Sequence, residues 1–376
     1  MPAQHSQALE ALLRRGRLRK LEPRSGADFT SNDYLGLAGS PELRAAIANA
    51  LQQGVPAGAG GSRLLRGNHP EHEALEAEAA AHFRAQAALY FGGGFIANTA
   101  IFSTLPGRGD LIIHDEWVHA SAHEGMRLSK AERVSARHND AEAFDSAITT
   151  WRAAGGIGQP WIAVESLYSM DGDRAPLDAL AAVADTHGAM LVIDEAHATG
   201  VLGPDGRGLS ASLEGRVNVI TLHTCGKALG VMGALVLSTR EVRDFLVNRS
   251  RAFIYATAPS PLMAAAVRAA LEISRSQPER RDRLHALVGF AGQQLAAHGF
   301  KTSGSHIQPI IVGSDARAVA LATALKARGF DIRAIRPPTV PEGTARLRLT
   351  LTLNTDEATV KALIAALAEE QARLQA

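Results

Sequence analysis

Cysteine is almost absent from this sequence of 376 residues, which contains only Cys225. A single cysteine cannot form an intramolecular disulfide, and it cannot supply the several thiolates of a structural zinc site. Disulfides are common in secreted domains and rare in reducing compartments. The sequence therefore indicates a protein of a reducing compartment without a cysteine-based metal site.

The chain also lacks an excess of charge of either sign, because 39 Lys and Arg side chains balance 38 Asp and Glu side chains. Nucleic-acid-binding proteins usually carry a strong basic excess. The one basic cluster, between Arg14 and Arg24, is short. Its simplest interpretation is a solvated helix face, so we expect no nucleic-acid partner.

Long hydrophobic runs are missing as well. No apolar stretch approaches the ~20 residues that a membrane-spanning helix needs. The first residues, MPAQHSQALEALLRR, lack the apolar centre of a signal peptide. We expect no membrane partner and a cytoplasmic location.

The sequence does contain short apolar runs that alternate with helix-like stretches, a pattern typical of βαβ units and a mostly parallel sheet. The runs are 88–91, 111–113, 161–164, 190–193, 217–222 and 234–237. At roughly 150 residues per domain, the length predicts two or three domains. Composition changes near SRSQPERRDR at 274–283. We therefore expect an α/β fold with an N-terminal arm (1–35), a large domain (36–272) and a smaller α/β C-terminal domain (273–376).

Three helix starts can be predicted from capping residues. Ser40 followed by Pro41 is typical of an N-cap and a first-turn proline. Asn68 and Asn354 are each followed three residues later by a glutamate, which resembles a capping box. The stretch after Asn354 has the apolar spacing of an amphipathic closing helix.

Polar residues follow three of the predicted strands. The run 190–193 is followed by Asp194 and, three residues later, by His197. The run 217–222 leads to Lys227, and the run 88–91 leads to three consecutive glycines. Open α/β sheets bind ligands at the carboxyl ends of their strands, so these residues are candidate site residues.

Two phosphate motifs can be tested against these residues. The glycines with Ala97 match the pattern G-x-G-x-x-A, which fits a dinucleotide site, another phosphate site or a plain turn. Lys227 is not a P-loop lysine, because Thr221 stands where that motif requires its first glycine and Ala228 follows the lysine.

A metal site is a further alternative for Asp194 and His197, but no third ligand stands near them in the sequence, and we expect no metal. Pyridoxal phosphate accounts for all the features together. It needs a lysine for its aldehyde, a carboxylate for its ring nitrogen, an anion cradle for its phosphate and a donor for its phenolate oxygen.

Six motifs, in order along nearly the whole chain, resemble the α-oxoamine synthase family. They are SNDYLGL (31–37), GGSR (60–63), SMDGD (169–173), DEAH (194–197), TCGK (224–227) and IRPPTVP (335–341). The resemblance implies a fold type I pyridoxal-phosphate enzyme whose large domain holds a mostly parallel seven-stranded sheet between helices. It also implies a homodimer with the active site at the subunit interface.

The resemblance assigns most of the chemistry to five residues. Lys227 would bind pyridoxal 5'-phosphate covalently, and Asp194 would pair with the ring nitrogen. Ser169 and His197 would hold the phenolate oxygen, and His119 would stack on the ring. The implied catalytic residues are Lys227, His119, Asp194 and His197.

The cofactor phosphate has its own implied set. Gly94 and Phe95 match the phosphate-side turn, and Thr224 would add a hydroxyl. Thr257 matches a threonine that reaches the phosphate of the partner subunit, although Ala256 replaces a frequent second hydroxyl beside it.

Substrate-binding residues follow from the same resemblance. Arg19 and Thr339 would contact the acyl substrate, and His119 is also among the implied substrate-binding residues. Arg348 would hold the amino acid carboxylate, a task that suits the two-pronged guanidinium group. The alternative for Arg19 and Arg348 is that each is an ordinary surface arginine.

The family's reaction is a decarboxylative condensation of an amino acid with an acyl thioester. The IRPPTVP motif favours members that join L-alanine to a pimeloyl thioester, carried on coenzyme A or on acyl carrier protein, over members that join glycine to acetyl-CoA. A dinucleotide-dependent oxidoreductase is the alternative from a different class, and it would leave Lys227 without a role.

Overall fold

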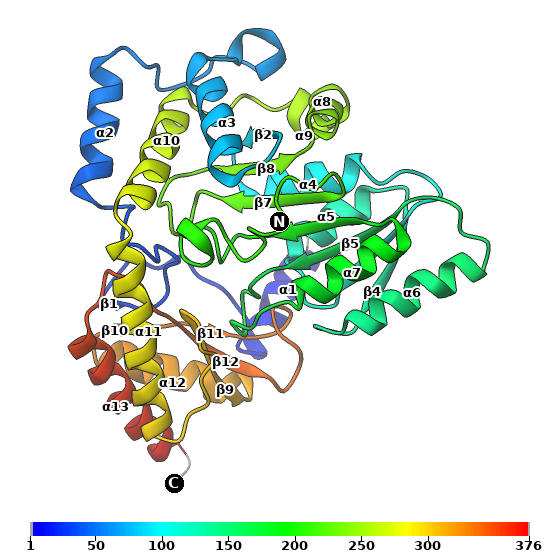
Figure 1. The fold of residues 1–376 in the computed structure, drawn as a ribbon. Coiled ribbons are helices and arrows are strands. Elements are labelled where there is room, and N and C mark those ends of the chain that lie inside the picture. The colour runs from blue at the N-terminus through cyan, green and yellow to red at the C-terminus, as the bar shows by residue number, and fades with distance from the viewer. Residues whose placement is uncertain (1–2, 375–376) are drawn as a thin grey trace. The chain divides into compact units, whose positions relative to one another are not determined.

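The structure is a computed structural model that describes residues 3–374. The chain divides into two compact units (Figure 1). The large unit comprises residues 35–169 and 174–281, and the small unit comprises the residues up to 34, residues 170–173 and those from 282 onward. The domain boundaries expected from the sequence stay a prediction.

A seven-stranded sheet forms the centre of the large unit, in the order β2-β8-β7-β6-β5-β3-β4. Strand β8 is antiparallel to both of its neighbours, and the remaining neighbours pair in parallel. This confirms the mostly parallel sheet. The strands are β2 (Ala87–Phe91), β3 (Leu111–Asp115), β4 (Glu132–Ala136), β5 (Pro160–Glu165), β6 (Met190–Asp194), β7 (Val219–Thr224) and β8 (Ala234–Ser238).

Helices cover both faces of this sheet, which explains why its central strands are apolar throughout. One core cluster joins the sheet to helices α4, α5, α8 and α9, and a second joins its other face to α6 and α7. Figure 1 shows both layers. The helices are α4 (Gly94–Thr104), α5 (Ala120–Leu128), α6 (Ala141–Ala153), α7 (Leu177–His187), α8 (Arg240–Arg249) and α9 (Arg251–Ile254).

Three further helices of the large unit pack against one another, with α10 (Pro261–Ser276) beside both α2 (Pro41–Gln52) and α3 (Pro70–Phe83). Two short helical turns complete the unit, a π-helical turn at Arg63–Gly67 and a 3-10 turn at Pro204–Gly206.

The sequence did not predict β4, and its composition explains why. Its residues, ERVSA, contain two charged side chains and are mostly exposed, because the strand lies at the edge of the sheet. Charged edge strands are a common protection against unwanted pairing with other chains. An apolar run is therefore a poor signal for such a strand.

Of the three predicted helix starts, Ser40 is confirmed, since its Oγ accepts a hydrogen bond from the N–H of Leu43. The other two are wrong. Helix α3 is capped by His69 instead of Asn68, and α13 (Glu357–Arg373) is capped by Asp356 instead of Asn354. In both cases a residue closer to the first turn provides the acceptor.

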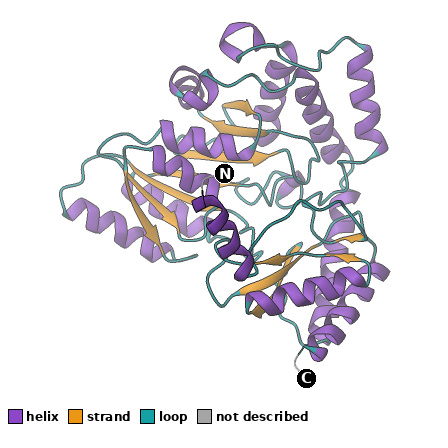
Figure 2. Cartoon of the chain, turned by 180° about the vertical axis from the view of Figure 1, so that it is seen from behind, coloured by secondary structure: helices purple, strands orange, loops and turns teal. Residues whose placement is uncertain are grey.

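The small unit is built on the antiparallel sheet β11-β12-β9, which α12 contacts, and α13 packs on α12. A parallel pair of two-residue strands, β1 and β10, lies beside them. Figure 2 distinguishes these strands and helices by colour. The elements are α1 (Ala3–Arg14), β1 (Ala27–Asp28), α11 (Glu279–Ala297), β9 (Ile307–Gly313), α12 (Asp315–Ala327), β10 (Phe330–Asp331), β11 (Ala334–Ile335), β12 (Ala345–Thr350) and α13.

None of the helices between residues 3 and 374 combines the length and the apolar character needed to cross a bilayer.

We predict that Leu191→Ala lowers the free energy of unfolding by about 2–5 kcal/mol, because Leu191 is fully buried in β6 and its removal leaves a cavity. Ile157→Ala is the matched control, because Ile157 is 94% exposed and its loss should change stability by at most about 0.5 kcal/mol. Denaturant unfolding followed by circular dichroism measures both. Equal effects of the two substitutions would contradict the buried position of β6.

Candidate active site

The site residues predicted from the strand ends lie at the carboxyl edge of the large unit's sheet. Strand β6 ends at Asp194, and its neighbour β5 ends at Glu165, which pairs with Asp194 in the sheet register. Strand β7 ends at Thr224, three residues before Lys227. Parallel strands bring these chain segments to one edge, where ligands bind in open sheets.

Lys227 and His197 are in direct contact. The Nζ of Lys227 lies 2.8 Å from Nε2 of His197, and the histidine is buried. Two protonated nitrogens would repel each other at this distance, so the contact requires a lone pair on one of them. The arrangement suits a lysine that must act as a nucleophile and as a base.

Both carboxylate oxygens of Asp194 accept hydrogen bonds. Oδ2 accepts a hydrogen bond from Nδ2 of Asn98 at 2.8 Å, and Oδ1 accepts one from the N–H of Ala196 at 2.9 Å. The same Asn98 amide donates to Oγ of Ser121 at 2.9 Å, and this Oγ lies 2.8 Å from Nδ1 of His119. A continuous chain of hydrogen bonds therefore connects Asp194 with His119.

His119 is fixed by its place in the chain. It is the N-cap of α5, and its Nδ1 accepts a hydrogen bond from the N–H of Ser121. The pKa of His119 lies below its usual value because of desolvation, with Asp194 raising it and Lys227 lowering it. A neutral ring in a fixed orientation can stack on a flat cofactor.

The predicted phosphate turn begins α4. Gly94 and Phe95 are its first two residues, and the N–H groups of a helix's first turn point outward without partners in the helix. Thr224 lies beside them, since a Cβ added at Gly94 would come within 3.6 Å of the Thr224 hydroxyl. The turn and the hydroxyl form one cradle.

Two further predicted residues lie in the large unit. The backbone N–H of Ser169 donates to the carboxyl group of Glu165. Thr257 lines a cavity of about 330 Å³ together with Gly92 and Arg63. Its contact with the phosphate of a partner subunit stays a prediction.

The three predicted substrate residues other than His119 lie in the small unit. Nη2 of Arg19 lies 3.4 Å from Oγ1 of Thr339. Arg348 is only 8% exposed, and it donates to Oγ1 of Thr350 at 2.8 Å and to Oδ1 of Asn32 at 3.1 Å. The alternative of an ordinary surface arginine is therefore wrong for Arg348.

Sequence reasoning missed three residues of the site: Asn98, Ser121 and Glu165. Asn98 and Ser121 are polar residues on apolar helix faces, a weak signal without a structure. Glu165 ends an apolar strand as Asp194 does, so the rule that selected Asp194 could also have selected Glu165.

The site has the donor set that pyridoxal phosphate requires. Lys227 offers an amine, Asp194 a carboxylate, and the start of α4 with Thr224 an anion cradle. Glu165 contributes a buried oxygen, Oε1, that has no hydrogen-bond partner among the described residues. Between residues 3 and 374, the His, Cys, Asp and Glu side chains form no group of three or more that could hold a metal.

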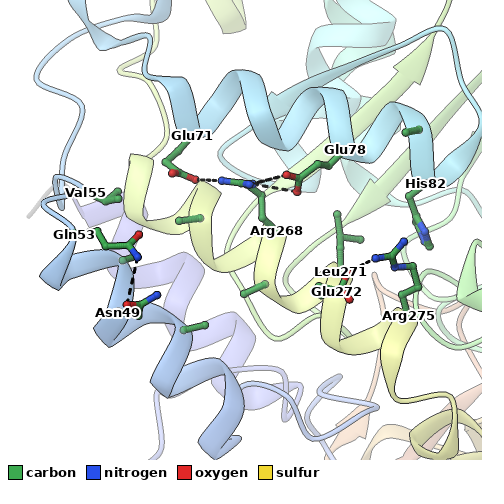
Figure 3. Close-up of a pocket in the computed structure, with 15 residues that line it drawn as sticks. Asn49, Gln53, Val55, Glu71, Glu78, His82, Arg268, Leu271, Glu272 and Arg275 are labelled. Atoms are coloured by element: carbon green, nitrogen blue, oxygen red, sulfur yellow. Dashed lines mark hydrogen bonds and ion pairs between the residues drawn. The ribbon is translucent and has the colours of Figure 1, made fainter.

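A larger cavity of the large unit lies elsewhere. It has a volume of about 720 Å³ and is lined by residues of α2, α3 and α10 (Figure 3). Arg268 bridges Glu71 and Glu78 across it, so its charges are largely paired with one another. Size alone does not identify the chemistry of this molecule.

A sequence model of the family "Aminotransferase class I and II" matches residues 25–367. The chain belongs to this family. The 8-amino-7-oxononanoate synthase of Anaeromyxobacter dehalogenans is 45% identical over 96% of this chain and 93% of its own length. The enzyme of that name from Chromobacterium violaceum is 43% identical over 92% of this chain and 89% of its own length. These relatives confirm the resemblance to α-oxoamine synthases.

Solved structures confirm the fold of this aminotransferase-family chain. The serine palmitoyltransferase of Sphingomonas wittichii matches with a TM-score of 0.88 and 28% identity over 99% of this chain and 97% of its own. The 8-amino-7-oxononanoate synthase of Francisella tularensis matches with a TM-score of 0.78 and 28% identity over 94% and 99%. A serine palmitoyltransferase variant from S. paucimobilis, solved with a pyridoxal phosphate–myriocin aldimine, has a TM-score of 0.88 and 26% identity over 99% and 98%. The fold is that of type I pyridoxal-phosphate transferases, and the cofactor is pyridoxal phosphate.

We predict that Asn98→Ala weakens the binding of pyridoxal phosphate by at least about tenfold, because Asp194 loses a charge-assisted hydrogen bond. Titration of the apoprotein, followed by the visible absorption of the bound cofactor, measures the dissociation constant. Asn248→Ala is the control, because Asn248 is an exposed residue of α8. An unchanged dissociation constant for Asn98→Ala would exclude this role of Asn98.

Proposed function

We propose that the chain condenses L-alanine with a pimeloyl thioester and releases 8-amino-7-oxononanoate, carbon dioxide and the free thiol carrier. This is a step of biotin biosynthesis. The observation that carries the proposal is the match to curated 8-amino-7-oxononanoate synthases at 45% identity over nearly the full length of both chains. The contact between Lys227 and His197 beside a fixed Asp194 supports the chemistry.

Pyridoxal phosphate, when bound, supplies an aldehyde that captures the amino acid and a ring that withdraws electrons from its α-carbon. Lys227 would release the cofactor carbonyl to the amino acid and then take the proton from the α-carbon. His197 would keep the Lys227 amine oriented and would help hold the phenolate oxygen together with Ser169. Asp194 would keep a proton on the ring nitrogen, which is why its two oxygens need fixed positions.

The small unit would supply the substrate contacts. Asn32 and Thr350 fix the guanidinium group of Arg348, which would bind the carboxylate of L-alanine. Arg19 and Thr339, which contact each other, would bind the acyl substrate. A buried and oriented guanidinium group favours one amino acid geometry over others.

Four further properties of the protein stay predictions. They are the homodimer with its site at the interface, the cytoplasmic location, the use of acyl carrier protein as an alternative donor, and the division into an arm, a large and a small domain.

Thiol release by the purified, cofactor-loaded protein tests the proposal. We expect release with L-alanine plus pimeloyl-CoA, and much less with glycine plus acetyl-CoA. A third pair, L-serine plus palmitoyl-CoA, tests a second candidate function, that of a serine palmitoyltransferase, because such enzymes match the fold with a TM-score of 0.88. Preference for either of the other pairs would overturn the choice of substrates.

Two variants separate catalysis from background thiol exchange. Lys227→Ala should abolish release because no other residue provides the amine at this position. Lys361→Ala, on the exposed face of α13, should leave release unchanged. Equal activity of the Lys227→Ala variant and the unmodified protein would contradict the proposed role of Lys227.

A further inference from the structure

Glu165 is a buried carboxyl group to which the proposed reaction gives no role. It ends β5 and is only 3% exposed. Because Glu165 and Asp194 are register partners on parallel strands, their side chains leave the sheet on the same face. The site therefore contains two neighbouring carboxyl groups, of which the proposed reaction uses one.

The carboxyl group of Glu165 also connects two loops that carry predicted cofactor residues. The backbone N–H groups of Ser169 and His119 both donate hydrogen bonds to it. Ser169 follows β5, whereas His119 precedes α5, so the two segments come from different parts of the chain. Glu165 holds them at a common point beside Asp194.

The other oxygen, Oε1, has a different environment. It is buried and has no hydrogen-bond partner among the described residues. Glu165 lines a cavity of about 10 Å³ with Asn98, His119 and Asp194, which is room for about one water molecule. An ionised oxygen here would lie near the charge of Asp194 and have no hydrogen-bond donor of its own, whereas a protonated oxygen could donate a hydrogen bond.

The charges around Glu165 favour the protonated form. Burial and the nearby Asp194 raise the pKa of Glu165 to about 8, although Lys227 and the two backbone donors oppose the rise. The phenol of Tyr168 also stays neutral, because burial together with the nearby carboxyl groups of Asp115 and Glu165 raises its pKa. Asp194, with its two donors, is then the carboxylate that carries the negative charge.

We propose that Glu165 is a positioning residue that acts as a neutral carboxylic acid: it accepts the N–H groups of Ser169 and His119 and donates its own proton into the cavity shared with Asp194. This inference rests on the proposed cofactor site and is independent of the choice of substrates. It explains how two carboxyl groups can lie side by side at one sheet edge while only one of them is charged.

Infrared spectroscopy of the cofactor-loaded protein tests the protonation state. We expect a carbonyl band of a protonated carboxylic acid at pH 7 that is absent from Glu165→Gln and that disappears from the unmodified protein as the pH rises through about 8. Glu132→Gln, on the exposed edge strand β4, is the control and should keep the band. Absence of the band from the unmodified protein at pH 7 would overturn the proposal.

Cofactor affinity tests the positioning role. Glutamine keeps both an acceptor and a donor, so Glu165→Gln should bind pyridoxal phosphate within about threefold of the unmodified protein. Glu165→Leu removes both and leaves the N–H groups of Ser169 and His119 without this acceptor, so it should bind at least about tenfold more weakly. Equal loss of cofactor affinity in both variants would show that the site needs a negative charge at Glu165. No loss of affinity in Glu165→Leu would show that cofactor binding does not need the hydrogen bonds from Ser169 and His119.

The readouts separate this proposal from the proposed function. If Glu165→Leu fails to fold, as judged by circular dichroism, the infrared band and the affinity of Glu165→Gln still decide the question. None of these measurements involves an amino acid or a thioester. A wrong substrate assignment would leave them unchanged, whereas a failure of the unmodified protein to bind pyridoxal phosphate would overturn the cofactor site itself.

Discussion

The register between β5 and β6 places the carboxyl groups of Glu165 and Asp194 side by side, and the rest of the site is arranged around that pair. Two like charges that close together in a partly desolvated site are costly, and the usual result is that one of the two groups stays protonated. The structure distributes donors accordingly. Asn98 and the N–H of Ala196 hold the two oxygens of Asp194, while backbone groups hold Glu165. One negative charge with a fixed direction results, and a ring nitrogen needs such a partner to stay protonated.

The protonation states of the Lys227 amine and of the His197 and His119 imidazoles are constrained in a similar way. Nζ of Lys227 and Nε2 of His197 lie 2.8 Å apart, so these two nitrogens cannot both be fully protonated. The pKa of His119 is lowered. The site therefore contains one fixed carboxylate, a lysine–histidine pair in which at least one nitrogen keeps a lone pair, and a histidine whose pKa is lowered. Such a set can move protons at neutral pH without large changes in its own charge. In the small unit, the polar face of β12 is buried instead of exposed, and Arg348 is oriented there by Asn32 and Thr350.

The parts of this arrangement that sequence could predict are those with a local signal. Apolar runs predicted the central strands, and the polar residues that follow them identified Asp194, His197 and Lys227. Asn98 could not be found in this way, because its importance comes from a contact with Asp194 across 96 positions of the chain. The charged edge strand β4 was missed because its place in the sheet depends on residues that are distant in sequence. The His69 cap was missed because α3 begins one residue later than the capping-box pattern indicates. The role of Glu165 became visible only with the sheet register.

Borohydride reduction of the cofactor-loaded protein, followed by peptide mass mapping, tests the central claim that this sheet edge is the pyridoxal phosphate site. Reduction fixes the cofactor covalently to whichever lysine holds it. We predict that the pyridoxyl group is found on Lys227 and on no other lysine. A label on a different lysine, or none despite bound cofactor, would contradict it.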